Sequence, residues 1–295
     1  MPRLNPSPIP FAGCFTKTRD FAESGKLVFS GLPSDKQSTF RSGARHAPDK
    51  IRKAYDGHCF HATTETGVDL YRFVTDLGDV EKKSDWAQTF DAYREWAKKL
   101  FLAKKVPFFA GGDHAVTIPV VEALAALKIP IHFIQFDAHP DLYPDYNGKI
   151  HSHACVAARI LEMSHVDSVT QLGIRAMNAQ QQQVADHHGD RLRIFNARTI
   201  QQSLPSLAYL PDNAHVYLSI DLDCFDPGCA PGVSHPVHGG LNSRQVINFI
   251  QDMRWNLVGM DVVELNPEVD EHDRTAILAA KVMHEAMGYV AKADI

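Results

Sequence analysis

Histidine and aspartate side chains recur where three apolar segments of the chain end. The segments lead into Gly-Gly-Asp-His at 111–114, Asp-Ala-His-Pro-Asp at 137–141, and Asp-Leu-Asp at 221–223. Alternate residues of an extended chain point to the same face, so the second and third groups can each direct their side chains to one point. Carboxylate oxygens with a minority of imidazole nitrogens suit divalent metals such as manganese better than thiolate sites do. The pattern therefore predicts a chain built around a pair of metal ions.

Elements of strand and helix length alternate along the chain and would position these residues. A fold of this kind is an α/β fold with a mostly parallel sheet covered by helices on both faces. Ligands of such sheets bind at the carboxyl ends of the strands, where His114, Asp137, Asp221 and Glu264 are all expected. The expected strands are 26–32, 70–77, 106–110, 129–137, 168–174, 192–195, 215–222 and 257–264. The expected helices are one starting near Pro48 and those at 85–104, 117–127, 152–162, 243–253 and 275–291.

Composition excludes several classes of protein. The chain of 295 residues has 30 basic and 35 acidic residues, giving a formal net charge of −5. It has no basic stripe of the kind that nucleic-acid binding requires, and no apolar stretch of bilayer length. Its five cysteines include no Cys-x-x-Cys pair, which argues against a disulfide framework or a thiolate zinc site. We expect a cytoplasmic protein with no nucleic-acid or membrane partner.

Two parts of unequal size are expected from the sequence. Residues 1–25 are polar and contain several prolines, so we predict an N-terminal arm there. The remainder, 26–295, contains no linker, internal repeat or low-complexity segment that would divide it. We therefore predict one catalytic domain over residues 26–295.

Taken together, the motifs resemble those of the ureohydrolase superfamily, which contains arginases, agmatinases, guanidinobutyrases and formiminoglutamases. The motifs are GGDH, FDAHPD, SIDLDCFDP, APG followed by GGL, and VVELNP, and the resemblance runs from about Gly31 to the C-terminus. It implies a three-layer α/β/α fold, assembly into homotrimers or homohexamers, and two Mn²⁺ ions bridged by a hydroxide, with Ni²⁺ or Co²⁺ as other possible metals. Asp137 and Asp221 would bridge both ions. The implied ligands are His114, Asp137, His139, Asp141, Asp221 and Asp223.

The resemblance also implies a hydrolase that acts on linear amidines. A metal pair can supply hydroxide at neutral pH and stabilise developing charge, and a guanidinium carbon is a poor electrophile that needs such a nucleophile. Glu264 matches the family carboxylate that holds the guanidinium, in a charge-assisted pair that also orients it. Asp141 would transfer a proton from the hydroxide. His153 matches the family's proton-shuttling histidine, although His151, two residues earlier, is an alternative.

The choice of substrate depends on fewer residues. Tyr143 follows the Asp-x-His-x-Asp motif where arginases have Asn and formiminoglutamases often have Arg, and in this it resembles agmatinases. His235 stands where agmatinases usually have a Thr near the guanidinium, so it could alter the pocket. We predict hydrolysis of agmatine to putrescine and urea, a step of polyamine biosynthesis. The alternatives are a guanidinobutyrase or other guanidino-compound hydrolase and a formiminoglutamase, followed by a single-metal deacylase and a non-catalytic binding protein.

Overall fold

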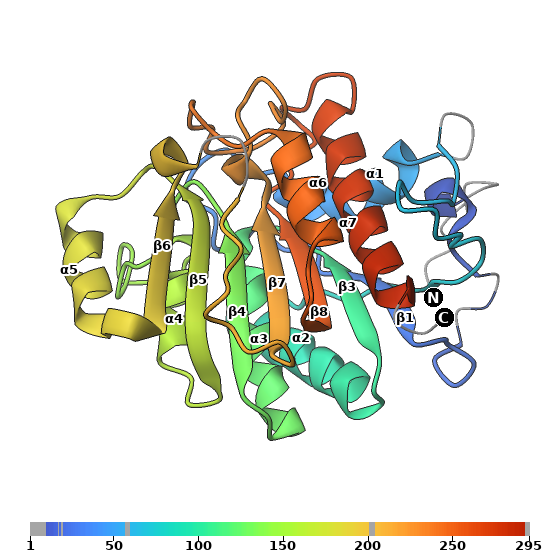
Figure 1. Cartoon of the computed structure of the whole chain (residues 1–295), viewed down its shortest axis with the longest axis horizontal. Coiled ribbons are helices and arrows are strands. Elements are labelled where there is room, and N and C mark those ends of the chain that lie inside the picture. The colour runs from blue at the N-terminus through green and yellow to red at the C-terminus, as the bar shows by residue number, and fades with distance from the viewer. Residues whose placement is uncertain (1–9, 17, 19, 57–59, 201–203, 293–295) are drawn as a thin grey trace.

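Eight parallel strands form a single sheet in the computed structural model, which describes residues 10–16, 18, 20–56, 60–200 and 204–292. Their order across the sheet is β2-β1-β3-β8-β7-β4-β5-β6 (Figure 1). The strands are β1 (Leu27–Gly31), β2 (Thr75–Asp79), β3 (Val106–Ala110), β4 (Ile131–Phe136), β5 (Val166–Ile174), β6 (Leu192–Asn196), β7 (His215–Asp221) and β8 (Asn256–Val263).

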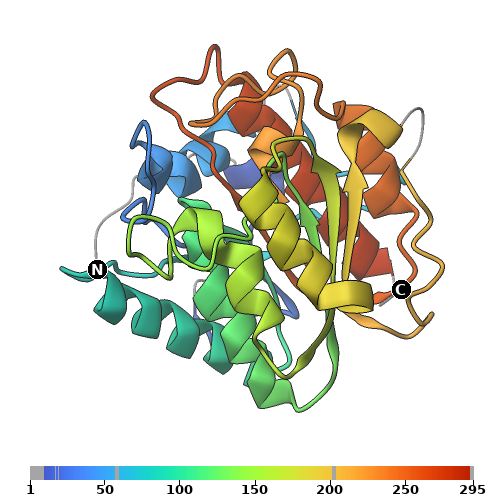
Figure 2. The same ribbon diagram turned by 90° about the vertical axis from the view of Figure 1, so that its left-hand side faces the viewer.

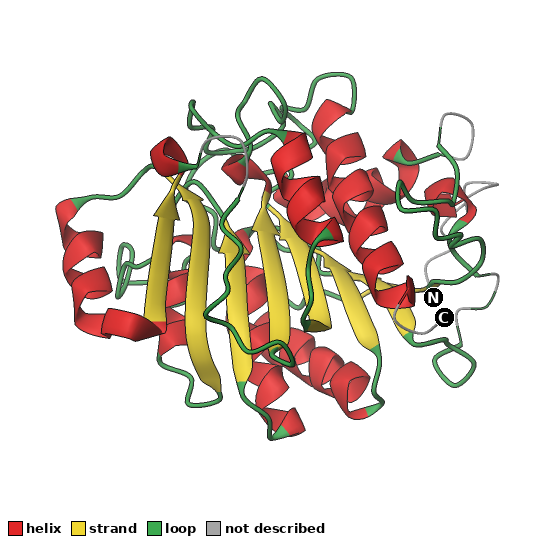
Figure 3. Cartoon of the chain, viewed as in Figure 1, coloured by secondary structure: helices red, strands yellow, loops and turns green. Residues whose placement is uncertain are grey.

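Helices cover both faces of this sheet. The helices are α1 (Ala47–Ala54), α2 (Trp86–Leu102), α3 (Thr117–Ala123), α4 (Val156–Leu161), α5 (Ala179–His188), α6 (Ser243–Gln251) and α7 (Arg274–Lys292). Figure 2 shows α2, α3 and α4 on one side of the strands and α6 and α7 on the other, and Figure 3 shows the helical layers in red around the yellow sheet. Two apolar clusters lie between the layers, one containing residues of α1, α6 and α7 and the other residues of α2, α3 and α4. The predicted three-layer α/β/α fold is confirmed.

Local sequence explains why the elements form where they do. The interior strand β3 reads Val-Pro-Phe-Phe-Ala and is buried at every position, as expected of a parallel strand covered on both faces. Helix α2 begins at Asp85, whose carboxylate accepts a hydrogen bond from the Gln88 N–H. Helix α6 begins with a capping box in which Asn242 and Gln245 each satisfy the other's backbone N–H. These caps fix the ends of helices that follow loops at the edge of the sheet.

The structure differs most from the sequence-based elements in two places. The strand expected at 70–77 is β2, which starts only at Thr75, and a turn occupies the preceding residues. Tyr71 and Phe73 made that turn resemble a strand, but their side chains are exposed to solvent. Helix α5 was not expected, because its sequence Ala-Gln-Gln-Gln-Gln-Val-Ala-Asp-His-His has little apolar periodicity.

Described residues of the proposed arm pack against the domain. The Phe11 and Phe15 rings stack with 5.0 Å between centroids, and both contact Phe29 of β1. Residues 1–9, 17 and 19 lie outside the described residues, so the division into an arm and a domain stays a prediction. Among the described helices, none has the length and apolar character needed to cross a bilayer.

Candidate active site

Four neighbouring strands deliver the predicted site residues to one edge of the sheet. In the order β3-β8-β7-β4, these strands lead into His114, Glu264, Asp221 and Asp137 respectively. Because all four strands are parallel, their carboxyl ends lie at the same edge. The loops after them bring together residues that are as much as 150 positions apart in the sequence. The predicted location of the site at the carboxyl ends of the strands agrees with this arrangement.

His114 faces a group of three carboxylates. Its Nδ1 atom lies 3.2 Å from an oxygen of Asp137, 3.1 Å from one of Asp141 and 3.3 Å from one of Asp221. All four side chains are buried, yet Nδ1 has no hydrogen-bond partner. An unpartnered ring nitrogen on which three carboxylates converge forms the kind of donor set that a divalent cation requires.

A hydrogen-bonded chain behind His114 determines which ring nitrogen is available. The Ser219 hydroxyl donates its only proton to Asp261 Oδ1 at 2.6 Å, so its oxygen accepts the hydrogen bond of His114 Nε2, 3.0 Å away. Nδ1 of the neutral ring then carries the lone pair that faces the carboxylates. Such a carboxylate behind a histidine ligand orients the ring and increases its basicity. Neither Ser219 nor Asp261 was identified from the sequence.

A second group contains His139, Asp223 and, again, Asp137. His139 Nδ1 lies 2.8 Å from an oxygen of Asp223 and 3.7 Å from one of Asp137. The donor atoms of Asp137 thus lie close to both histidines, and Gln135 donates a 2.7 Å hydrogen bond that orients this carboxylate. The structure brings the six predicted ligands together as two groups that share Asp137, and their chemistry fits two divalent ions. Their role as metal ligands stays a prediction.

The six candidate ligands form one cluster, the carboxylate cluster, in which negative charge is concentrated. Burial and the Asp137 charge raise the pKa of Asp141 to about 7. Burial, with the charges of Asp223 and Asp137, also raises the pKa of Asp221 well above its usual range. Burial alone would lower the pKa of His139, but the same two carboxylates raise it to about 12. Protons therefore neutralise the cluster when no metal is bound.

We expect metal-free protein to lose thermal stability as the pH rises from 5 to 8. A group whose pKa is raised by folding stabilises the fold below its unfolded pKa, and that contribution is lost as the pH rises through the folded pKa. Asp141 and Asp221 act in this direction, because they must ionise inside a buried anionic cluster. The melting temperature of chelator-treated protein should fall by about 5 °C or more, while metal-loaded protein should change much less. Parallel melting curves across this range test the expectation, and equal slopes for the two forms would contradict it.

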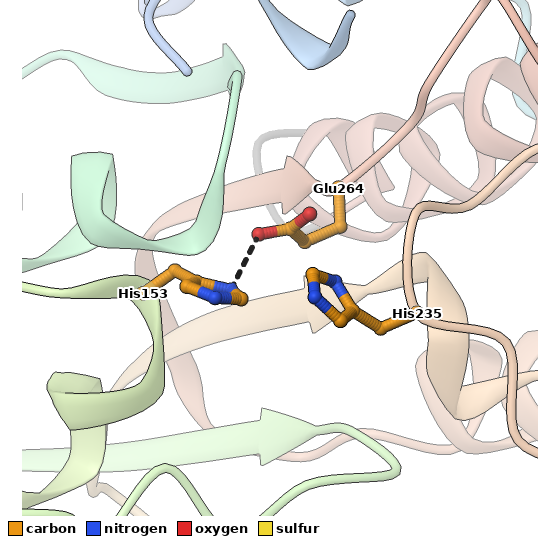
Figure 4. Close-up of side chains that lie close together, drawn as sticks. All are labelled: His153, His235 and Glu264. Carbon is orange, nitrogen blue, oxygen red and sulfur yellow. Dashed lines mark ion pairs between the residues drawn. The ribbon is translucent and has the colours of Figure 1, made fainter. Parts of the chain in front are cut away.

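Glu264 and His153 lie side by side and form an ion pair (Figure 4). Glu264 Oε1 accepts a 2.8 Å hydrogen bond from the His114 backbone N–H and lies 3.3 Å from His153 Nδ1. Glu264 Oε2 is buried without a partner. Burial would lower the pKa of His153, but its contact with Glu264 and the nearby acids raise it to about 9. The alternative, His151, stacks on Phe90 and does not line the pocket described next.

A pocket of about 180 Å³ opens onto these residues. It also contains Tyr143 and His235, the two residues expected to bind substrate. Of the described residues that line it, none is lysine or arginine, and four are carboxylates. The lining residues are Thr39, His139, Asp141, Tyr143, Tyr146, His153, Ala154, Ala176, Gln181, Asp221, Asp223, His235 and Glu264.

Several lining residues were missed from the sequence. Thr39 belongs to the loop after β1, and its hydroxyl lies 2.8 Å from His153 Nε2. Gln181 comes from α5 and accepts a hydrogen bond from the Leu142 backbone N–H. Asn178, which caps α5 and does not itself line the pocket, donates to the Tyr143 hydroxyl at 2.6 Å. The Gln run at 180–183 was the only sign of this helix, and nothing marked Thr39.

Two site residues have unusual backbone conformations. Asp141 has φ = 50° and Glu264 has φ = 64°, in the left-handed region that non-glycine residues rarely adopt. Such conformations persist only where the surrounding structure imposes them, and they gather at functional sites. At both positions the strained residue carries a buried carboxylate of the candidate site.

Comparisons with known proteins agree with this geometry. The model of the arginase family matches residues 25–288. Arginase 1, mitochondrial, of Arabidopsis thaliana is 35% identical over 276 residues, covering 89% of this chain and 80% of the relative. Agmatinase of Bacillus cereus is 30% identical over 279 residues, covering 92% and 94%. The crystal structure of agmatine ureohydrolase of Thermoplasma volcanium superposes with a TM-score of 0.82 at 27% identity, covering 99% of this chain and 96% of that one.

Proposed function

Since the chain belongs to the arginase family of hydrolases, whose members act on guanidino and amidine substrates, we propose that it hydrolyses agmatine to putrescine and urea. The observation that carries this proposal is the unpartnered, buried Oε2 of Glu264 in an acidic pocket beside the six candidate ligands. A buried carboxylate oxygen without a partner is energetically costly, and a guanidinium N–H would satisfy it.

The candidate ligands and the acidic side chains have distinct tasks in this reaction. A bound metal pair, which we propose to be Mn²⁺, supplies an activated water at neutral pH and stabilises developing negative charge. His114, Asp137, His139, Asp141, Asp221 and Asp223 would hold the two ions. Glu264 would hold the planar guanidinium in one orientation, which presents its carbon to the nucleophile.

Two residues can move the protons that the reaction requires. The attacking water must lose a proton, and the leaving amine must gain one. Asp141 borders both the candidate ligand group and the pocket, so it can accept the first proton. His153 has a raised pKa of about 9 and lies in the pocket wall, so its protonated ring can donate to the leaving amine.

The charge of the pocket favours agmatine among guanidino compounds. Agmatine is cationic at both ends, and the described lining residues offer carboxylates, tyrosine hydroxyls and no lysine or arginine. Arginine, guanidinobutyrate and formiminoglutamate would each bring at least one carboxylate into this anionic pocket. Arginine is the second candidate, because the Arabidopsis relative at 35% identity is named an arginase.

A substrate panel tests the proposal. We expect manganese-loaded protein to release urea from agmatine with a kcat/KM about a hundredfold or more above that for arginine, which corresponds to about 2.7 kcal/mol. Guanidinobutyrate and guanidine are tested in the same way, by urea release. Formiminoglutamate is tested by the release of formamide. A preference for arginine would overturn the choice of agmatine but keep the family activity. The absence of turnover from any of these substrates by protein carrying two metals would overturn both.

Three further properties stay proposals. We propose that the protein assembles as a homotrimer or homohexamer, which sedimentation analysis can measure. We also propose manganese over nickel or cobalt, to be checked by comparing activity after reloading with each metal. The cytoplasmic location stays a prediction, since the Arabidopsis relative is named a mitochondrial protein.

A further inference from the structure

Two histidines and a glutamate form a third group of potential metal ligands, outside the six candidate ligands. His153 lies just before α4, His235 lies in the loop after β7, and Glu264 follows β8. One nitrogen of each ring and one Glu264 oxygen all lie within 4.8 Å of one another. Figure 4 shows both imidazole rings turned toward each other beside the carboxylate. Two histidines and one carboxylate with open positions are a donor set that zinc and related metals use in proteins.

The distances suit a small tetrahedral ion. Zinc bonds to nitrogen and oxygen are about 2.0–2.2 Å long, which places neighbouring ligand atoms of a tetrahedron roughly 3.3–3.6 Å apart. His153 Nδ1 and Glu264 Oε1 are separated by 3.3 Å. The two rings are tilted by 38° with 4.9 Å between centroids, so small side-chain rotations can bring a His235 nitrogen to the same point.

The surroundings of the group also suit a metal. Thr39 Oγ1 lies 2.8 Å from His153 Nε2, so it can accept that N–H and direct the Nδ1 lone pair toward Glu264. Outer hydrogen bonds of this type fix the orientation of histidine ligands. Glu264 is 2% exposed, and its Oε2 has no hydrogen-bond partner, which is an independent sign that a cation belongs here.

We propose that His153, His235 and Glu264 form a third divalent-metal site that binds zinc and, when occupied, excludes the guanidino substrate. The ion would take the position between His153 and Glu264 that a proton otherwise holds. It would also occupy the free carboxylate oxygen on which guanidinium binding depends. The inhibitory part of this inference rests on the proposed function, whereas the binding of a third ion does not.

Charge allows the third ion to bind beside an occupied metal pair. The four candidate ligand carboxylates already balance two divalent ions, and Glu264 adds a negative charge that they do not neutralise. A divalent ion at this position therefore neutralises excess negative charge in a pocket whose described lining residues include no lysine or arginine. Zinc and the guanidinium are thus expected to compete for the same oxygen.

The metal content of each chain tests the site directly. Protein loaded with two Mn²⁺ ions is dialysed against micromolar Zn²⁺, and both metals are counted by mass spectrometry. We expect two manganese ions and one zinc ion in the unsubstituted protein, and two manganese ions without zinc in His235→Asn. Thr39→Val should bind the third ion about 10- to 100-fold more weakly. His238→Asn is the matched control, because His238 lies exposed in the same loop and should leave zinc binding unchanged.

The other outcomes separate this inference from the proposed function. Zinc uptake accompanied by an equal loss of manganese means exchange in the metal pair, and would overturn the third site. Equal zinc uptake by the unsubstituted protein and by His235→Asn would also overturn it. With an active enzyme, zinc should raise the KM for agmatine without lowering kcat. If a third zinc ion binds but no substrate is turned over, the site stands and the proposed function fails.

Discussion

Asp137→Asn should lower the metal content to one ion per chain or fewer and reduce turnover by about a thousandfold or more. The reason is the position of this carboxylate, whose oxygens lie close to both His114 and His139. An amide has nearly the same shape but no charge, so both groups of candidate ligands lose their shared anion. Metal analysis by mass spectrometry and urea release from the same sample provide the two measurements.

A matched control separates this effect from a general loss of negative charge. Asp167 lies in β5, the strand that pairs with β4, and its side chain is exposed. Asp167→Asn should keep both metals and the full rate. If Asp137→Asn also kept two metals and its activity, the assignment of Asp137 as a bridging ligand would be wrong.

Glu264→Gln should keep both metals but lower kcat/KM by about a hundred- to a thousandfold, equivalent to about 3–4 kcal/mol. Glutamine can still accept the hydrogen bond from the His114 N–H, so the backbone around the candidate ligands should stay in place. What is lost is the negative charge that would pair with the guanidinium. Steady-state kinetics with agmatine, together with metal analysis, measure the two effects separately.

Glu268→Gln is the control for this substitution. Glu268 follows in the same loop, and more than half of its side chain is exposed, so its charge is screened by solvent. We expect its kinetics to match those of the unsubstituted protein. A Glu264→Gln protein that lost its metals would show that this carboxylate supports the metal groups instead of binding substrate.

The fold could be predicted from the sequence because several of its strands are short apolar runs with clear ends. β3 and β4 are short apolar runs that end at Gly111 and Asp137, and the predicted boundaries differ from the observed ones by two residues at most. The candidate ligands and Glu264 were found for the same reason, since they lie at or soon after the ends of such runs. Their convergence at one edge of the sheet follows from parallel strands alone. His153, Tyr143 and His235 were instead identified from the family resemblance.

The parts that the sequence did not predict depend on packing between distant segments. Thr39 reaches His153 from 114 positions away, and a lone threonine in a polar loop carries no sign of that contact. Ser219 lies inside β7 and Asp261 inside β8, where a buried polar residue within an apolar run shows no partner until the strands are placed side by side. Helix α5 was not predicted because it buries almost none of its residues. Gln181 is its only buried residue, so its sequence has no apolar periodicity that would indicate a helix.

The left-handed backbones of Asp141 and Glu264 set a limit on how stable this molecule can become. Glycine adopts such conformations without the steric penalty that other residues incur, and at Asp141 it would also remove a carboxyl group whose ionisation is disfavoured by burial. Selection for stability alone would therefore favour the loss of these two side chains. Natural proteins commonly sacrifice stability at functional positions in this way. An engineer who searches this chain for stabilising substitutions would thus be led first to residues on which its chemistry depends.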